Sequence, residues 1–130
     1  MSLLSRLRRR GEEPLPAYAD DGTLRLLVTA ADPARADSAV LAEAGLDPDR
    51  WLLVRHHLVG LPDEATVEQA RELLGQDGYT LTVGPGPPYA VRAWRTQVLT
   101  ALSASQERSR MAGLAQRLGA DVGGYDVLGP

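Results

Sequence analysis

The stretch Trp51–Val59, which reads WLLVRHHLV, constrains the fold more than any other part of the chain. It is rich in apolar residues and is bounded by proline-containing segments at 47–49 and 60–62, a pattern typical of a buried β-strand. Successive side chains of a strand point to opposite faces. One face would then carry three aliphatic residues and a histidine: Leu52, Val54, His56 and Leu58. The other face would carry a mixed set: Trp51, Leu53, Arg55 and His57.

The segments after this strand alternate between helical and strand patterns. Residues 63–75 have apolar positions at helical spacing, residues 79–83 alternate as a strand, and residues 89–100 form a second long strand. An amphipathic helix over 103–118 and a short strand over 120–127 complete the chain. This βαββαβ order is typical of the split βαβ arrangement. The sequence therefore predicts an α+β fold, a ferredoxin-like sandwich with the first and third of these strands in its centre.

The part of the chain before Trp51 divides into two regions. Residues 1–22 carry arginines and prolines, and we expect them to form a flexible basic tail. The alternative for this segment is an arm that contacts a membrane surface or RNA. Residues 23–31 predict a strand, and Asp32-Pro33 predicts the start of a helix that ends at Gly45. We thus expect a single domain over 23–130, with this strand and helix as an N-terminal extension of the sandwich.

The composition narrows the classes of function. The chain has no cysteine, which excludes disulfides and thiolate chemistry. Its net charge of −3 argues against a bulk polyanion binder. No apolar run is long enough for a membrane span, and no secretory signal is visible, so we expect no membrane partner and a cytoplasmic location. All 14 basic residues are arginine, which indicates GC-rich coding and a bacterial source rather than phosphate recognition.

The residues that could carry chemistry do not assemble into a catalytic set. His56 and His57 are adjacent on a strand and face opposite sides, and there is no third histidine, so we expect no metal and no cofactor. The glycine- and proline-rich segment 84–88 lacks the donors of a phosphate loop and fits a hairpin connector better. No serine stands in the setting of an activated nucleophile. The sequence therefore predicts a protein that is not an enzyme.

A sheet face without helices is the most interesting surface that the pattern predicts. It would carry the second face of the 51–59 strand, with Arg55 and His57, next to residues of the strand at 89–100. Periodicity leaves two sets open for that neighbour: either Arg92, Trp94 and Thr96, or Tyr89, Val91 and Ala93. Arginines and aromatic residues on a sheet are how RNA-recognition folds stack unpaired bases. The alternatives are that the N-terminal strand and helix cover this face, or that Trp94 lies in the core.

Several short motifs resemble the regulator of ribonuclease activity B family. They are Asp47-Pro48-Asp49, His56-His57-Leu58, Gly78-Tyr79, Gly119-Ala120 and Gly124-Tyr125, and the resemblance covers residues 37–128. Two departures stand out. The family's Tyr-Asp-Gly-Trp element reads Val122-Gly123-Gly124-Tyr125 here and lacks the aspartate, and the charge of −3 is small beside the strongly acidic members.

The resemblance implies a ferredoxin-like, non-catalytic protein that inhibits ribonuclease E by binding its non-catalytic scaffold region. Exposed aromatic residues and arginines tend to dominate protein interfaces. We therefore expect the partner-binding residues to be Arg55, His57, Trp94 and Tyr125. Two alternatives remain open at this point: a module that binds single-stranded RNA through the sheet face, and a ligand-sensing or oligomerising ferredoxin-like domain that forms a homo-oligomer.

Overall fold

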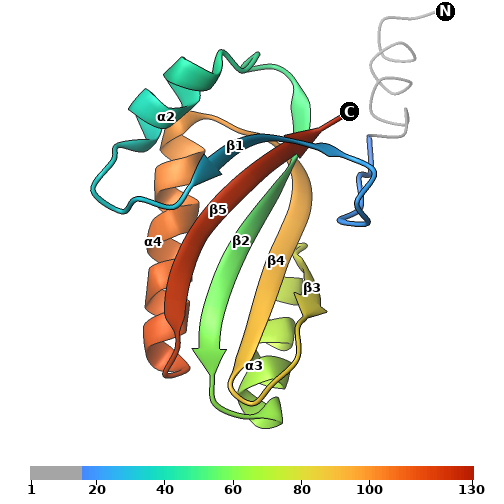
Figure 1. Ribbon diagram of the computed structural model, residues 1–130, viewed down its shortest axis with the longest axis vertical. Helices are drawn as coiled ribbons and strands as arrows, with labels where there is room; N and C mark the ends of the chain where they lie inside the picture. Colours follow the sequence, from blue (N-terminus) through green and yellow to red (C-terminus); the bar gives the residue numbers. More distant parts are fainter. Residues whose placement is uncertain (1–15) are drawn as a thin grey trace, which may run out of the picture.

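The computed structural model describes residues 16–130, which form a mixed α+β domain around one five-stranded sheet. The elements in chain order are β1 (Arg25–Ala30), α2 (Asp37–Ala44), β2 (Trp51–Leu61), α3 (Glu64–Gly75), β3 (Thr80–Val83), β4 (Tyr89–Val98), α4 (Ala101–Arg117) and β5 (Asp121–Gly129). The strand order is β1-β5-β2-β4-β3, and every neighbouring pair is antiparallel (Figure 1).

The predicted ferredoxin-like sandwich is confirmed. From β2 onward the elements follow the βαββαβ order, and β2 and β4 occupy the centre of the sheet as expected. The N-terminal extension adds β1 to the sheet as an edge strand beside β5. The alternative in which the N-terminal strand and helix cover the second sheet face is therefore wrong.

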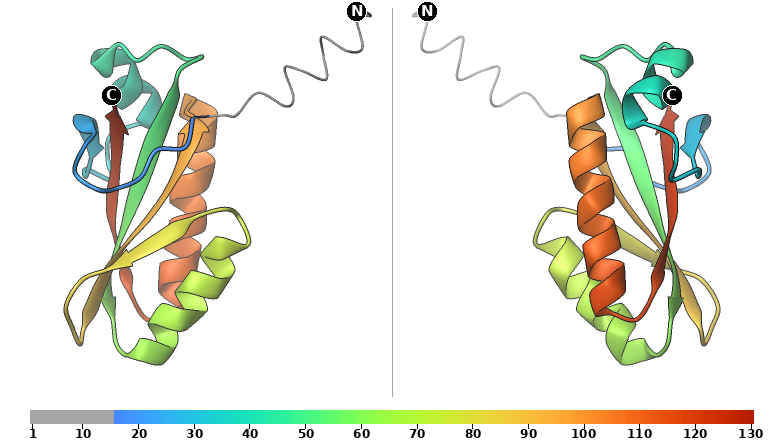
Figure 2. Two further views of the ribbon diagram at one scale, coloured as in Figure 1. Left: turned by 90° about the vertical axis from the view of Figure 1, so that its right-hand side faces the viewer. Right: turned by 90° about the vertical axis from the view of Figure 1, so that its left-hand side faces the viewer.

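The two faces of the sheet are covered very differently. Helices α3 and α4 lie against one face, which we call the helix face (Figure 2). Helix α2 joins this layer, because its Val40 packs in one cluster with Val54 of β2 and Ala104 of α4. The opposite face, which we call the open face, carries no helix among the described residues.

The hydrophobic core lies between the sheet and the helices. The alternation predicted for β2 is observed, since Leu52, Val54, His56 and Leu58 are all buried on the helix face. Below them, α3 and α4 contribute Leu74 and the fully buried Met111, among other residues. Burying such side chains stabilises a fold by about 1.5–3 kcal/mol each, so this layer is the main source of stability.

The N-terminal extension departs from the sequence expectation in two places. Asp32-Pro33 does not begin the helix, because the Asp32 carboxylate accepts the Ala34 N–H at 2.9 Å and closes a turn; α2 begins at Asp37 instead. Residues 16–22, expected to lie in the flexible tail, pass over the open face, and we call them the N-terminal strap. There the Tyr18 N–H donates to Thr96 Oγ1 at 2.9 Å. Residues 1–15 of the expected tail lie outside the described residues.

Candidate functional site

A network of charged side chains occupies the middle of the open face. Arg55 of β2 donates from Nε and Nη2 to Asp126 Oδ2 at 2.9 and 2.8 Å, and from Nη1 to Asp20 Oδ1 at 2.7 Å. The same Asp126 oxygen accepts from His57 Nε2 at 2.5 Å, and its other oxygen accepts from Thr29 Oγ1 at 3.0 Å. We call these five residues the open-face network. It joins β1, β2, β5 and the N-terminal strap.

The strand register brings these residues to one face. Arg55 lies opposite Asp126 on β5 and opposite Trp94 on β4. His57 lies opposite Arg92 in the same way. Directly opposed residues of antiparallel strands point to the same side of the sheet. This register settles the question that periodicity left open, because it places Trp94 and Arg92 on the open face.

The network holds Asp126 as a carboxylate. Burial acts to raise the pKa of the Asp126 side chain, but hydrogen bonds from His57 and Arg55 outweigh it and lower the pKa from 3.8 to about 2. Asp126 is therefore an acceptor that fixes Arg55 and His57 in position. The aspartate had no signal of its own in the sequence, because its role depends on the pairing of β5 with β2.

The accessible part of the open face lies beside this network. The Arg92 side chain is 40% exposed, and its only ion pair among the described residues is a 3.4 Å contact from Nε to Asp20 Oδ2. Trp94 is half-buried, and its indole N–H donates to Thr82 Oγ1 at 3.0 Å. Next to them, β2, β3 and β4 form a groove of about 270 Å³ that includes His57, Arg92 and the exposed Val59 and Val83 among its lining residues.

Tyr125 was expected among the partner-binding residues, but it lies on the helix face. It is 1% exposed, and its hydroxyl donates to the buried Asp37 of α2 at 2.8 Å. Its ring lies 5.6 Å from that of His56, which is on the helix face. Of the four expected contact residues, the open face brings together Arg55, His57 and Trp94. Tyr125 belongs to the core.

A second polar network, which was not expected from the sequence, is buried under α4. Its centre is Glu107, which is 6% exposed. Oε1 of Glu107 accepts the Tyr79 hydroxyl at 2.5 Å and Arg95 Nη2 at 3.1 Å, and Oε2 accepts Gln97 Nε2 at 2.8 Å. His56 Nε2 lies 3.6 Å from Oε1, too far for a hydrogen bond. Glu107 stands four residues before Met111 and therefore lies on the apolar stripe of α4. A charged residue on that stripe was the sequence feature that could have indicated a buried network.

We expect the carboxylates of Glu107 and Asp126 to make the domain sensitive to acid. Burial acts to raise the pKa of Glu107, but His56, Tyr79 and Gln97 together lower it from 4.5 to about 2. A carboxylate with a lowered pKa in the folded state contributes stability above its unfolded pKa and loses it as the pH falls through the folded value. Protonation of Glu107 and Asp126 should therefore lower the free energy of unfolding by a few kcal/mol between about pH 4.5 and about pH 2.

Urea titrations at a series of pH values measure this effect. We expect the urea concentration at the midpoint of unfolding to change little from about pH 7 to about pH 5 and then to fall steeply. A midpoint that stays level down to about pH 3 would contradict the role given to the two networks.

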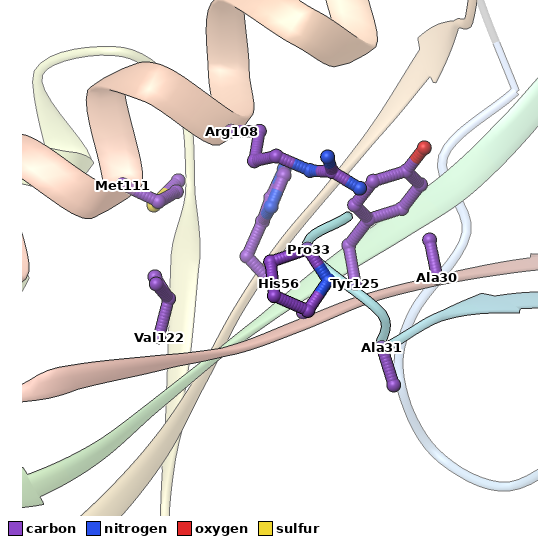
Figure 3. Close-up of a pocket in the computed structure, with 9 residues that line it drawn as sticks. Ala30, Ala31, Pro33, His56, Arg108, Met111, Val122 and Tyr125 are labelled. Atoms are coloured by element: carbon purple, nitrogen blue, oxygen red, sulfur yellow. The ribbon is translucent and has the colours of Figure 1, made fainter. Parts of the chain in front are cut away.

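A small cavity lies on the helix face where β1 leaves the sheet. Its volume is about 80 Å³, and its walls include His56, Arg108, Met111, Val122 and Tyr125 (Figure 3). Arg108 is engaged by Asp37 at 3.1 Å. Within residues 16–130, no three histidine or acidic side chains gather as metal ligands would. The lining is mostly apolar, so the cavity offers space but few groups for chemistry.

Comparison with known proteins gives one result. The family described as regulator of ribonuclease activity B matches residues 38–127, which is more than half of the chain and agrees with the range expected from the motifs. No curated protein and no solved structure matches the chain. No helix within residues 16–130 is long and apolar enough to cross a membrane. On the family match, the chain belongs to the regulator of ribonuclease activity B family.

Proposed function

We propose that this protein regulates RNA turnover in the cytoplasm of a bacterium by binding and inhibiting a ribonuclease E-type endoribonuclease. It binds the non-catalytic scaffold region of that enzyme and carries out no reaction itself. The observation that carries the proposal is the family match over residues 38–127, which includes all of β2 and β4 and most of β5. These strands supply the accessible groups of the open face.

The open face is the surface that fits a partner best. The helix face is occupied by α3 and α4, whereas the open face leaves Arg92 and His57 accessible beside Val59. Interfaces combine an apolar centre with arginine and aromatic residues. This groove supplies the apolar residues and the arginine. Trp94 borders it through its contact with Thr82.

A protein partner explains the details of the face better than RNA does. The Arg55 guanidinium already donates to Asp126 and Asp20, so it has little capacity left for a phosphate. The Trp94 indole is half-buried and bonded to Thr82, which restricts base stacking. The net charge of −3 also opposes binding to a polyanion.

We expect Arg92→Gln to weaken binding to a purified scaffold fragment of the ribonuclease by about tenfold, since an interface arginine contributes roughly 1–2 kcal/mol. The matched control is Arg117→Gln, which removes the same charge from an exposed position of α4. Isothermal titration calorimetry with the full chain measures both. Equal affinities of the two variants would place the contact surface elsewhere.

Calorimetric and fluorescence titrations with single-stranded RNA test the second candidate function. We expect weak binding and little quenching of tryptophan fluorescence. Tight RNA binding that falls steeply with salt, together with no affinity for the scaffold fragment, would replace the proposal with an RNA-binding function.

A further inference from the structure

Asp20 of the N-terminal strap occupies a position that an acidic group from another molecule could take. Its carboxylate lies between two guanidinium groups, 2.7 Å from Arg55 Nη1 and 3.4 Å from Arg92 Nε. The Asp20 side chain is only 4% exposed, although its neighbours Ala19 and Asp21 are exposed. The strap therefore inserts a single carboxylate into the face and leaves the adjacent residues in solvent.

Arg55 is fixed without Asp20, whereas Arg92 has Asp20 as its one ion-pair partner among the described residues. Arg55 is held by two hydrogen bonds to Asp126, and it lies on β2 in the centre of the sheet. Arg92 lies on β4, the other central strand. If Asp20 is removed, the two guanidinium groups face only one carboxylate, that of Asp126. Without Asp20, this part of the face therefore has an excess of positive charge, which favours the binding of an anionic group.

The strap, by contrast, has few attachments. It contains no helix or strand, and besides Asp20 its hydrogen bonds to the sheet join the Tyr18 backbone to Thr96 Oγ1, at 2.9 Å for N–H and 3.5 Å for C=O. Asp20 Oδ2 has no hydrogen bond in addition to its contact with Arg92. A segment with so few buried contacts belongs to the low-stability end of a fold.

We infer that Arg55 and Arg92 form a receptor for an acidic side chain of the protein partner, and that Asp20 is an internal competitor for it. This inference rests on the proposed function, because it assumes that the open face is the contact surface. The partner presents an aspartate or glutamate that takes the place of the Asp20 carboxylate, next to the groove that His57 and Arg92 line. The apparent affinity for the partner is then the intrinsic affinity multiplied by the fraction of molecules in which the strap is undocked.

Asp20→Asn tests this competition, and Asp21→Asn is its control. Both variants remove one negative charge, and an asparagine at 21 can still accept from the Thr23 N–H, as Asp21 does at 3.0 Å. The probe is poly-L-glutamate, titrated into the full-length protein at low salt. We expect the Asp20→Asn variant to have an affinity for poly-L-glutamate at least about fivefold higher than that of the Asp21→Asn variant. Adding Arg92→Gln to Asp20→Asn should abolish the gain.

Three outcomes would overturn the inference. Equal affinities of the Asp20 and Asp21 variants would show that the strap does not compete. A gain that survives Arg92→Gln would show that the arginine pair is not the receptor. A larger gain for polyuridylate than for poly-L-glutamate would assign the site to RNA. The scaffold fragment forms a separate arm: if it binds no variant, the proposed function fails, while the polyglutamate result still decides this inference.

Discussion

Replacing Gly124 with alanine should destabilise the domain by about 3 kcal/mol or more, one of the largest effects of any single substitution in the chain. Gly124 has φ of +87°, a conformation that costs an L-residue about 1–2 kcal/mol. A β-carbon there would also overlap the backbone carbonyl oxygen of Ala30 and lie 2.9 Å from Cα of Ala31. Backbone atoms of a paired strand cannot rotate away, so β1 itself must move.

Two other glycines separate the contributions of strain and overlap. Gly119 also has a positive φ, of +71°, but a β-carbon there meets nothing within 4 Å. Gly119→Ala should therefore show the conformational cost alone, about 1–2 kcal/mol. Gly113 lies inside α4 with open space around it, and Gly113→Ala should stabilise the protein by about 0.5–1 kcal/mol.

Thermal and urea unfolding of the three variants measures these differences. The order of stability should be Gly113→Ala above wild type, then Gly119→Ala, then Gly124→Ala. If Gly119→Ala and Gly124→Ala lose the same amount, the approach of β1 to β5 at Gly124 is looser than described.

The same glycine explains why the face of Tyr125 could not be derived from the sequence. The β2–β5 register shifts between His56 and Leu58, opposite the stretch of β5 that contains Gly123 and Gly124. An irregularity of one residue reverses the side that every later residue faces. Counting alternation along β5 therefore fails at this point. Only the observed pairing of His56 with Tyr125 places the tyrosine in the core.

The central strand β2, unlike β5, could be assigned from its sequence pattern. β2 has an unbroken alternation from Trp51 to Leu58, and its burial follows that alternation except at Leu53, which is buried on the open face. The fold class followed from this pattern and from the order of elements after it. The face on which Trp94 lies could be assigned only from its register opposite Arg55. Alternation alone did not assign it, because β4 has apolar residues at both odd- and even-numbered positions.

The open-face network was predictable only in part. Arg55 and His57 were expected on this face from alternation alone, whereas Asp20 and Asp126 were not expected there. These acids meet Arg55 through contacts 35 and 71 residues apart in the chain, and no local spacing encodes such a contact. Local patterns define faces, but the partners of a charge on a face depend on the tertiary fold.

Glu107 should be the second position at which a single substitution has a large effect. Glu107→Ala removes the acceptor of the Tyr79 hydroxyl, of Gln97 and of Arg95 at once. It leaves these donors without this acceptor between α4 and the sheet, where Tyr79 is buried and Gln97 and Arg95 are half-buried. Breaking a buried charged network from one side costs about 3–5 kcal/mol, and we expect a loss in that range.

The control for this change is Gln106→Ala. Gln106 is the neighbouring residue on α4 and is exposed, so its replacement should alter stability by less than about 0.5 kcal/mol. Urea unfolding at neutral pH compares the two variants. A loss in Glu107→Ala no greater than that in Gln106→Ala would mean that water satisfies the three donors.

Glu107→Gln separates the charge of this residue from its shape. The amide keeps one acceptor oxygen for Tyr79 but cannot accept from both Arg95 and Gln97 as the carboxylate does. It also has no proton to gain near pH 2, where the carboxylate of the wild type is titrated. We therefore expect this variant to be less stable than wild type at neutral pH and to lose less stability on acidification. The two urea midpoints should converge as the pH approaches about 2, because the wild type gives up there the stabilisation that the variant never has.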